Sequence, residues 1–200
     1  MYRKNLKDEF YTRKSRADGY PARSVYKLEE INQKHKLIKK GDIVMDLGAS
    51  PGSWTLYTSK IVGKEGRVLS IDLENLKFSA QGNVIFVKRD ILKLDQIDLK
   101  NWEEKFDVVM ADLAPKTSGV ISMDVGRSLE LSEKAFEIAK LVLKEGGNFI
   151  TKIFEGEGVD DFAKEVEKSF KVFKRARPQA IIKHSKEFYI VAKGYEKQRD

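Results

Sequence analysis

Short apolar runs and amphipathic stretches alternate along most of the chain. The apolar runs have the length and flanking turn residues of buried strands, and they occupy 42–47, 67–72, 84–87, 106–112 and 148–154. Between them, apolar residues recur at helical spacing over 53–62, 124–143 and 159–169. Two more strands are expected near 170–175 and 187–192, with no helix between them. The pattern predicts an α/β fold: a mostly parallel seven-stranded sheet with an antiparallel edge strand and helices on both faces.

The remaining segments are polar or basic and lie outside this alternation. A helix is expected from Ala22 onward, and residues 1–20 are interpreted as a basic arm outside the sheet. The glycine pair at 146–147 is expected to end the helix over 124–143. The loop over 115–126 is either a mobile lid over a substrate or an ordinary surface loop.

The composition narrows the class of protein. At 200 residues, the chain fits a single domain over 1–200. The absence of cysteine excludes disulfides, thiolate catalysis and a cysteine-based zinc site, and two histidines do not favour a His-rich metal centre. The sequence contains no apolar run of about 18 residues and no apolar signal core. We therefore expect a cytoplasmic monomer with no metal and no membrane anchor.

Positive charge is concentrated in two stretches of the chain, within a net charge of +7 and a pI of about 9.3. Over 1–26, seven Lys/Arg stand against three Asp/Glu and alternate with aromatic residues. Over 170–186 there are six Lys/Arg and no acid. Basic residues mixed with aromatics favour RNA as a partner, through phosphate contacts and base stacking. A solvated, charge-rich surface is the alternative for either stretch.

A candidate cofactor loop follows the first predicted strand and reads Asp46-Leu47-Gly48-Ala49-Ser50-Pro51-Gly52-Ser53-Trp54. In open α/β sheets, ligands bind at the carboxyl ends of the strands, and glycines let the backbone approach them closely. A dinucleotide-binding loop would read G-x-G-x-x-G, whereas these two glycines are four residues apart with Pro51 between them. The loop suits a nucleoside cofactor without a pyrophosphate, such as S-adenosylmethionine, and a structural turn is the alternative.

Two acids and a tryptophan extend this candidate cofactor site. Asp72 ends the second predicted strand, where a carboxylate can accept hydrogen bonds from both ribose hydroxyls of a nucleoside. Asp90 follows the third strand and either accepts from an adenine amino group or caps a helix. Trp54 either packs against the cofactor or is buried against the sheet.

Four charged residues that are distant in sequence fall near the ends of predicted elements: Lys27, Asp112, Lys152 and Glu187. Lys152 follows apolar residues in a predicted central strand, where a charge is costly unless it has a function. A lysine can deprotonate a weakly acidic hydroxyl when a second cation disfavours its charged form. Lys152 is the candidate base and Lys27 the second cation, with Asp112 orienting Lys152 and Glu187 holding Lys27. For each residue alone, a surface salt bridge is the alternative.

With these motifs in this order, the chain resembles the FtsJ/RrmJ family of ribose 2′-O-methyltransferases over nearly its whole length. The matching segments are 23–31 (RSVYKLEEI), 46–54 (DLGASPGSW), 111–115 (ADLAP), 152–156 (KIFEG) and 185–189 (SKEFY). The resemblance implies a Rossmann-like methyltransferase fold and a catalytic tetrad of Lys27, Asp112, Lys152 and Glu187. It also implies S-adenosyl-L-methionine as cofactor. The cofactor-binding residues expected from the loop and the resemblance together are Asp46, Gly48, Pro51, Gly52, Trp54, Asp72, Asp90 and Asp112.

The substrate that the resemblance implies is a uridine ribose of large-subunit ribosomal RNA, within the large ribosomal subunit. Transfer RNA stays open as an alternative substrate. A non-catalytic RNA-binding assembly factor and a nucleotide-dependent oxidoreductase stay open as alternative functions, although a pure binder has no need of the tetrad. Many relatives carry a Ser-Arg pair shortly after the proline of the closing segment, whereas this chain has Ile181-Ile182 after Pro178. We therefore expect different RNA contacts there. The basic arm over 1–20 is expected to bind RNA as well.

Overall fold

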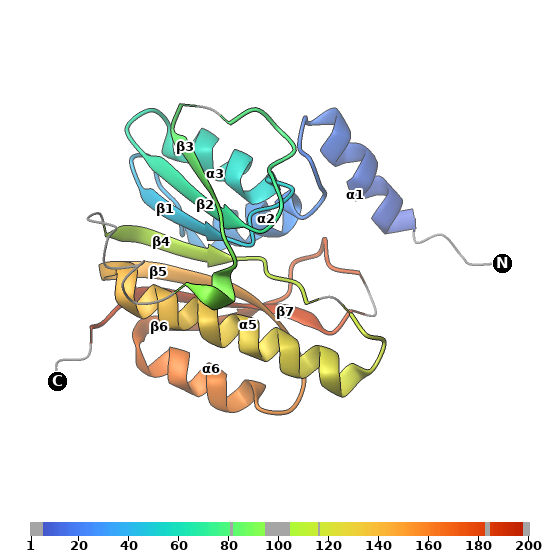
Figure 1. Cartoon of the computed structure of the whole chain (residues 1–200), viewed down its shortest axis with the longest axis vertical. Coiled ribbons are helices and arrows are strands. Elements are labelled where there is room, and N and C mark those ends of the chain that lie inside the picture. Colours follow the sequence, from blue (N-terminus) through green and yellow to red (C-terminus); the bar gives the residue numbers. More distant parts are fainter. Residues whose placement is uncertain (1–5, 81, 95–104, 116, 183–184, 198–200) are drawn as a thin grey trace.

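The fold is organised around one seven-stranded sheet (Figure 1). The computed structural model describes residues 6–80, 82–94, 105–115, 117–182 and 185–197. The strands are β1 (Ile43–Leu47), β2 (Arg67–Asp72), β3 (Val84–Lys88), β4 (Phe106–Ala111), β5 (Leu143–Phe154), β6 (Phe170–Ala176) and β7 (Glu187–Tyr195). They lie in the order β3-β2-β1-β4-β5-β7-β6. Because strand order reverses between β1 and β4, the carboxyl ends of these two strands mark the place where ligands bind in such sheets.

Helices cover both faces of the sheet, as the sequence predicted (Figure 1). One face packs against α5 (Ile121–Val142) and α6 (Val159–Lys168). The other face packs against α2 (Val25–His35) and α3 (Ser53–Val62). A short 3₁₀ helix, η1 (Ile91–Lys93), follows β3. The structure is therefore a doubly wound α/β sheet, the architecture that the sequence predicted.

β7 is the strand that departs from parallel order. It runs antiparallel to both β5 and β6, so β6 at the edge has the same direction as the parallel strands. The expected antiparallel pair is present, but the antiparallel strand lies one position inside the edge instead of at it. The connection between β6 and β7 is too short for the helical crossover that parallel pairing requires. Glu187, the first residue of β7, consequently lies at the edge where β4 and β5 end.

Two element boundaries differ from the sequence-based prediction. α5 begins at Ile121, earlier than expected, and Asp124 in its first turn accepts a hydrogen bond from the backbone N–H of Ser118 at 2.7 Å. β5 begins at Leu143, directly after α5, so the glycine pair at 146–147 lies within this strand and does not end the helix. The pairing with β4 shifts register there, and an irregular strand segment accommodates glycine well. Residue 116 of the predicted 115–126 loop lies outside the described residues.

Aromatic side chains fill the core beneath α5 and α6. Phe136 lies 5.6 Å from Phe149 and 6.1 Å from Phe162, measured between ring centroids. Phe149 stacks on Phe170 at 6.3 Å. Buried aromatic pairs at these separations contribute stability beyond the area they bury. This core supports the central strands whose carboxyl ends carry the candidate site.

The predicted N-terminal arm is largely a helix. α1 (Leu6–Ala17) lies outside the sheet and beside α2 (Figure 1), and residues 1–5 lie outside the described residues. The Nζ atom of Lys14 lies 4.0 Å from the centre of the Tyr26 ring, and the Tyr26 hydroxyl donates to Asp18 at 2.8 Å. These contacts attach the arm to the first turn of α2.

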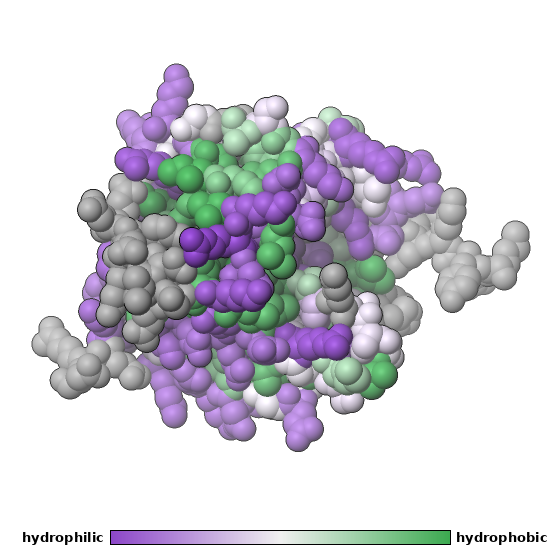
Figure 2. Space-filling model, in the orientation of Figure 1, coloured by the Kyte–Doolittle hydropathy of each residue, from purple (hydrophilic) through white to green (hydrophobic). Residues whose placement is uncertain are grey.

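Charged and polar side chains cover most of the face in Figure 2. A hydrophobic area lies over β3, where Ile85 is 51% exposed on the strand at the free edge of the sheet (Figure 2). Within the described part of the chain, no helix has both the length and the apolar composition needed to cross a membrane.

Candidate active site and cofactor cavity

Alternation along three strands directs the predicted catalytic side chains to one face of the sheet. On β4, β5 and β7, neighbours two positions away from Asp112, Lys152 and Glu187 belong to the core against α2 and α3. Successive side chains in a strand point to opposite faces, so these three residues point to that same face. Lys27 comes from the first turn of α2, which covers it. Folding therefore brings all four residues to one end of the sheet.

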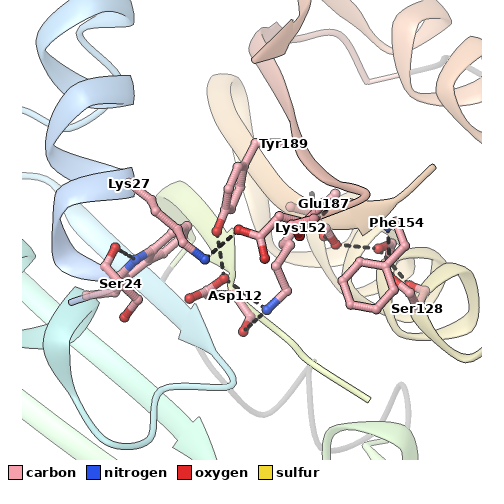
Figure 3. Close-up of polar contacts among 12 residues, drawn as sticks. Ser24, Lys27, Asp112, Ser128, Lys152, Phe154, Glu187 and Tyr189 are labelled. Carbon is pink, nitrogen blue, oxygen red and sulfur yellow. Dashed lines mark hydrogen bonds and ion pairs between the residues drawn. The ribbon is translucent and has the colours of Figure 1, made fainter. Parts of the chain in front are cut away.

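The four side chains form two ion pairs (Figure 3). Lys27 Nζ lies 2.5 Å from Glu187 Oε1, and Lys152 Nζ lies 3.1 Å from Asp112 Oδ1. Lys152 also donates to the backbone carbonyl of Asp112 at 3.0 Å. Each lysine thus has the carboxylate partner that the sequence predicted, while the catalytic role of the tetrad stays a prediction.

Both ion pairs are largely withdrawn from water. The exposed fraction of the side chain is 6% for Lys152 and 14% for Asp112, and 13% for Lys27. Removing charges from water costs free energy that an exposed pair does not incur. The alternative of a surface salt bridge therefore does not describe these residues. Buried, specifically paired charges in a cleft are typical of functional sites.

Tyr189 is a member of the site to which sequence reasoning assigned no role. Its hydroxyl donates to Asp112 Oδ1 at 2.9 Å, the oxygen that also contacts Lys152 (Figure 3). Burial raises the pKa of Tyr189 well above its ordinary value, and the charges of Asp112 and Glu187 raise it further. The phenol therefore stays protonated and remains a donor. Its position two residues after Glu187 on a strand, and hence on the same face, was the available signal.

A cavity of about 460 Å³ lies beside the tetrad. The segments that follow β1, β2, β3 and β4 form its walls, and four predicted cofactor residues line it: Gly48, Asp72, Asp90 and Asp112. Its size falls within the range of about 300–1,000 Å³ that small-molecule sites occupy. Because Asp112 belongs to both the cavity and the tetrad, a ligand in the cavity can reach the immediate surroundings of Lys152.

Asp72 and Asp90 supply carboxylate oxygens to this cavity. Asp72 accepts backbone hydrogen bonds from Ser50 at 2.9 Å and Glu74 at 2.8 Å. Asp90 accepts from the backbone of Leu92 at 3.1 Å and caps η1, so the capping alternative and the cavity position both hold. Each carboxylate keeps lone pairs for ligand hydroxyl or amino groups. The described residues include no group of three or more His, Cys, Asp or Glu arranged to hold a metal ion.

The glycines of the cofactor loop are required by its geometry. Gly48 has φ 78° and Gly52 has φ 111°, values that side-chain-bearing residues rarely adopt. A Cβ atom on Gly48 would lie 2.6 Å from the side chain of Leu113, and one on Gly52 would lie 2.4 Å from Phe78. Pro51 follows a cis peptide bond in the same turn. The loop therefore lets the backbone approach its surroundings more closely than a side chain would allow.

Trp54 lies beneath the tetrad in the first turn of α3. Its indole Nε1 donates to the backbone carbonyl of Ser24 at 2.9 Å, and its ring lies 5.7 Å from that of Tyr189. With 3% of its surface exposed, the residue is buried against the sheet, which is one of the two alternatives for it. Contact with a cofactor stays a prediction.

Asp46 is fully buried at the end of β1. Its Oδ2 accepts from the hydroxyl of Thr55 at 2.6 Å, whereas its Oδ1 has no hydrogen-bond partner among the described residues. Burial raises the pKa of Asp46 to about 7; the Thr55 hydrogen bond opposes this rise, and Asp112 and Asp72 add to it. Asp46 does not line the cavity, so its contact with a cofactor stays a prediction.

Asp46→Asn is expected to change how stability depends on pH. Since the folded-state pKa is raised from 3.8 to about 7, the folded protein retains a proton that the unfolded chain releases. This contribution to stability is full below about pH 4 and is lost as pH rises to about 7. In urea unfolding without added cofactor, the free energy of unfolding of the wild type should decrease, relative to that of the variant, by up to ~1.4 kcal/mol for each unit of rising pH over this range. Asparagine keeps the hydrogen bond from Thr55 but does not titrate. Equal pH dependence of stability in the two proteins would therefore contradict the raised pKa of Asp46.

Gly52→Ala is expected to weaken binding of S-adenosylmethionine by about tenfold, or ~1.4 kcal/mol, because a Cβ atom there would lie 2.4 Å from Phe78 and displace the cofactor loop. Gly63→Ala is the matched control, since Gly63 has φ 67° but open space around its Cβ position. Calorimetric titration with cofactor would measure both affinities, and thermal unfolding would report the shared strain. Equal affinities in the two variants would show that the Gly52 turn does not shape the cavity.

Comparison with known proteins agrees with the family resemblance of the sequence. Residues 20–195 match the family described as FtsJ-like methyltransferase. The chain is 43% identical over 195 residues to ribosomal RNA large subunit methyltransferase E of Desulfatibacillum aliphaticivorans, covering 98% of this chain and 93% of the relative. It is 40% identical over 186 residues to the protein of the same name from Bdellovibrio bacteriovorus, covering 92% of this chain and 94% of the relative.

A solved structure shows the same fold. A protein described as a ribosomal RNA methyltransferase from Plasmodium falciparum superposes with a TM-score of 0.78 at 24% identity, covering 90% of this chain and 100% of that chain. At that identity the likeness supports the fold alone.

The family match includes the cofactor loop and all four tetrad residues. FtsJ-like methyltransferases use S-adenosyl-L-methionine, and the cavity lined by Gly48, Asp72 and Asp90 fits that cofactor. The chain therefore belongs to the FtsJ-like methyltransferase family.

Proposed function

We propose that this protein transfers a methyl group from S-adenosyl-L-methionine to the 2′-hydroxyl of a uridine ribose in large-subunit ribosomal RNA. The observation that carries the proposal is a buried tetrad that borders the cofactor cavity and shares Asp112 with it. The printed names of the relatives support ribosomal RNA as the substrate. The net charge of +7 supports a polyanionic partner.

Lys152 is the proposed general base. A ribose hydroxyl attacks the methyl carbon well only after its proton leaves, so the base must lie beside the methyl donor. Lys152 donates to both the carboxylate and the backbone carbonyl of Asp112. A neutral amine keeps two N–H donors and can retain both contacts. Its lone pair then points away from Asp112 and is available to the ribose hydroxyl.

Asp112 and Tyr189 act as positioning residues in this mechanism. Asp112 fixes the direction of the Lys152 amine, and the hydroxyl of Tyr189 holds the Asp112 carboxylate. Because Tyr189 is buried in the core, the carboxylate is anchored to the sheet and not to a loop. A base held within tenths of an ångström of its working position contributes to catalysis through orientation.

Lys27 and Glu187 are proposed to position the target nucleotide. The two residues pair with each other, so Glu187 compensates the charge of Lys27 until substrate offers a phosphate. Arg23 lies nearby and pairs with Asp8 of α1; burial lowers the pKa of Arg23, and the charge of Glu187 opposes this shift. We assign Arg23 and Lys27 to phosphate contacts, and the arm over 1–20 to further RNA binding.

Labelled S-adenosylmethionine would test the proposed function. The protein would be incubated separately with large ribosomal subunits, free ribosomal RNA and transfer RNA, and the RNA digested to nucleosides. We expect labelled 2′-O-methyluridine from the large-subunit sample. Label in transfer RNA alone would identify transfer RNA as the substrate instead of ribosomal RNA. If no RNA is labelled although the protein binds the cofactor, an enzymatic role is contradicted.

Lys152→Ala is expected to lower kcat by about 10²–10⁴-fold, the usual contribution of a general base. Cofactor affinity should remain close to that of the wild type, because Lys152 contacts Asp112 and not the far part of the cavity. Lys64→Ala, at an exposed turn, serves as the control for loss of a lysine. Single-turnover assays and cofactor titration would separate the two effects, and a comparable loss of cofactor binding would exclude Lys152 as the base.

A further inference from the structure

A basic recess, separate from the cofactor cavity, lies between helix α2 and strand β6. This α2–β6 groove has a volume of about 330 Å³. It is lined by Glu30, Ile31, Lys34, His35, Lys174, Arg175, Ala176, Arg177 and Pro178. The mechanism uses none of these residues.

The groove holds more positive charge than its own acid neutralises. That one acid, Glu30, is engaged with the backbone N–H of Gln179 at 2.7 Å. Arg175 points to the opposite face of the sheet, where it pairs with Asp160 at 2.5 Å. Lys34 and Lys174 have no ion-pair partner in the part of the chain that the structure describes. These two cations are therefore available to a ligand.

Strand alternation directs Lys174 toward α2. In the antiparallel pair of β6 and β7, Lys174 lies opposite Val191, which belongs to the core against α2 and α3. Residues that are opposite one another in a sheet share a face. Lys174 thus faces α2, and Lys34 comes from the last turn of that helix.

His35 reflects the same concentration of charge. Its pKa is lowered, first by burial and then by the charges of Lys34, Lys193 and Lys174. Lys193 is already committed, because its Nζ donates to the backbone carbonyl of His35 at 2.8 Å. Lys34 of α2 and Lys174 of β6 thus line this recess, and Lys193 of β7 contacts His35 behind its lining.

The α2–β6 groove is continuous with the tetrad along both of its walls. On the helix wall, Lys27 and Lys34 are seven residues apart, two turns along one face, or roughly 10 Å. On the strand wall, Ala176 of the groove pairs with Tyr189, whose hydroxyl contacts Asp112. A polymer seated at Lys27 can therefore continue directly into the groove.

We propose that the α2–β6 groove binds the phosphate backbone of RNA nucleotides that flank the methylated one, with Lys34 and Lys174 as the phosphate ligands. The inference rests on the proposed function, because the polymer that reaches Lys27 in that proposal is RNA. Lysines that bind phosphate set position without reading sequence. The groove would fix the direction in which RNA crosses the site.

The test compares two charge-matched double variants of the full-length protein. Lys34→Gln/Lys174→Gln removes the two proposed phosphate ligands. Lys64→Gln/Lys168→Gln removes two exposed charges at the edge where the parallel strands begin, away from the tetrad. Glutamine keeps the aliphatic stem, and thermal unfolding with cofactor titration would verify that both variants fold and bind S-adenosylmethionine.

Fluorescence anisotropy with a labelled ribosomal RNA stem-loop would measure affinity across a salt series. We expect the groove variant to bind on the order of tenfold more weakly than the control variant. The negative slope of log K against log salt should become shallower by about 1.4. This is ~0.7 for each of the two phosphates of single-stranded RNA that a lysine no longer neutralises. In methylation assays, KM for the stem-loop should rise while kcat is unchanged, because these lysines bind ground and transition states equally.

Equal affinity and equal salt slope in the two variants would overturn the groove as an RNA site and would leave an acidic protein surface as its partner. The readout does not depend on turnover. A wild-type protein that binds the stem-loop through the groove but methylates no RNA would contradict the proposed function and leave the groove intact. If the wild-type protein methylates RNA while the groove variant behaves like its control, the proposed function stands and the groove is excluded as an RNA site.

Discussion

The antiparallel pairing of β5 with β7 is the interaction on which the site depends. Its register places Lys152 opposite Tyr189 and the end of β5 opposite Glu187. Since β7 runs against its neighbour, its first residue lies at the edge where the parallel strands end. A parallel β7 would carry Glu187 to the other edge of the sheet, roughly 26 Å away. Charges from β5, β7 and the end of β4 would then not meet beneath α2.

Bringing those charges together is costly, and the surroundings of the site show how the cost is offset. Both lysines are paired, and Asp112 receives Tyr189 and Lys152 on one oxygen. Buried pairs of this kind are weak devices for stability. The aromatic cluster around Phe136 and Phe149 on the opposite face supplies packing that does not depend on them. The core on the face opposite the tetrad therefore does not depend on these charges.

Helix α2 links three parts of the molecule. Its first turn carries Lys27 and contacts the N-terminal arm through Tyr26. Its last turn carries Lys34 into the α2–β6 groove. Because the helix is rigid and packed on the sheet, the spacing between these points is set by its pitch. An RNA strand following that wall would have its target ribose and its flanking phosphates positioned by one element.

The sequence by itself determined the type and order of most elements, because buried strands and amphipathic helices leave periodic patterns within a few residues. It also determined the candidate loop and tetrad, since spaced glycines and a lysine inside an apolar run are local signals. Only the tertiary structure decided that β7 lies inside the edge, that the glycine pair at 146–147 lies within β5, and that Tyr189 holds Asp112. The helical form of the polar arm and the α2–β6 groove were likewise decided there. These features arise from pairing and packing between segments far apart in the chain, and no local pattern records which distant segment will be the partner.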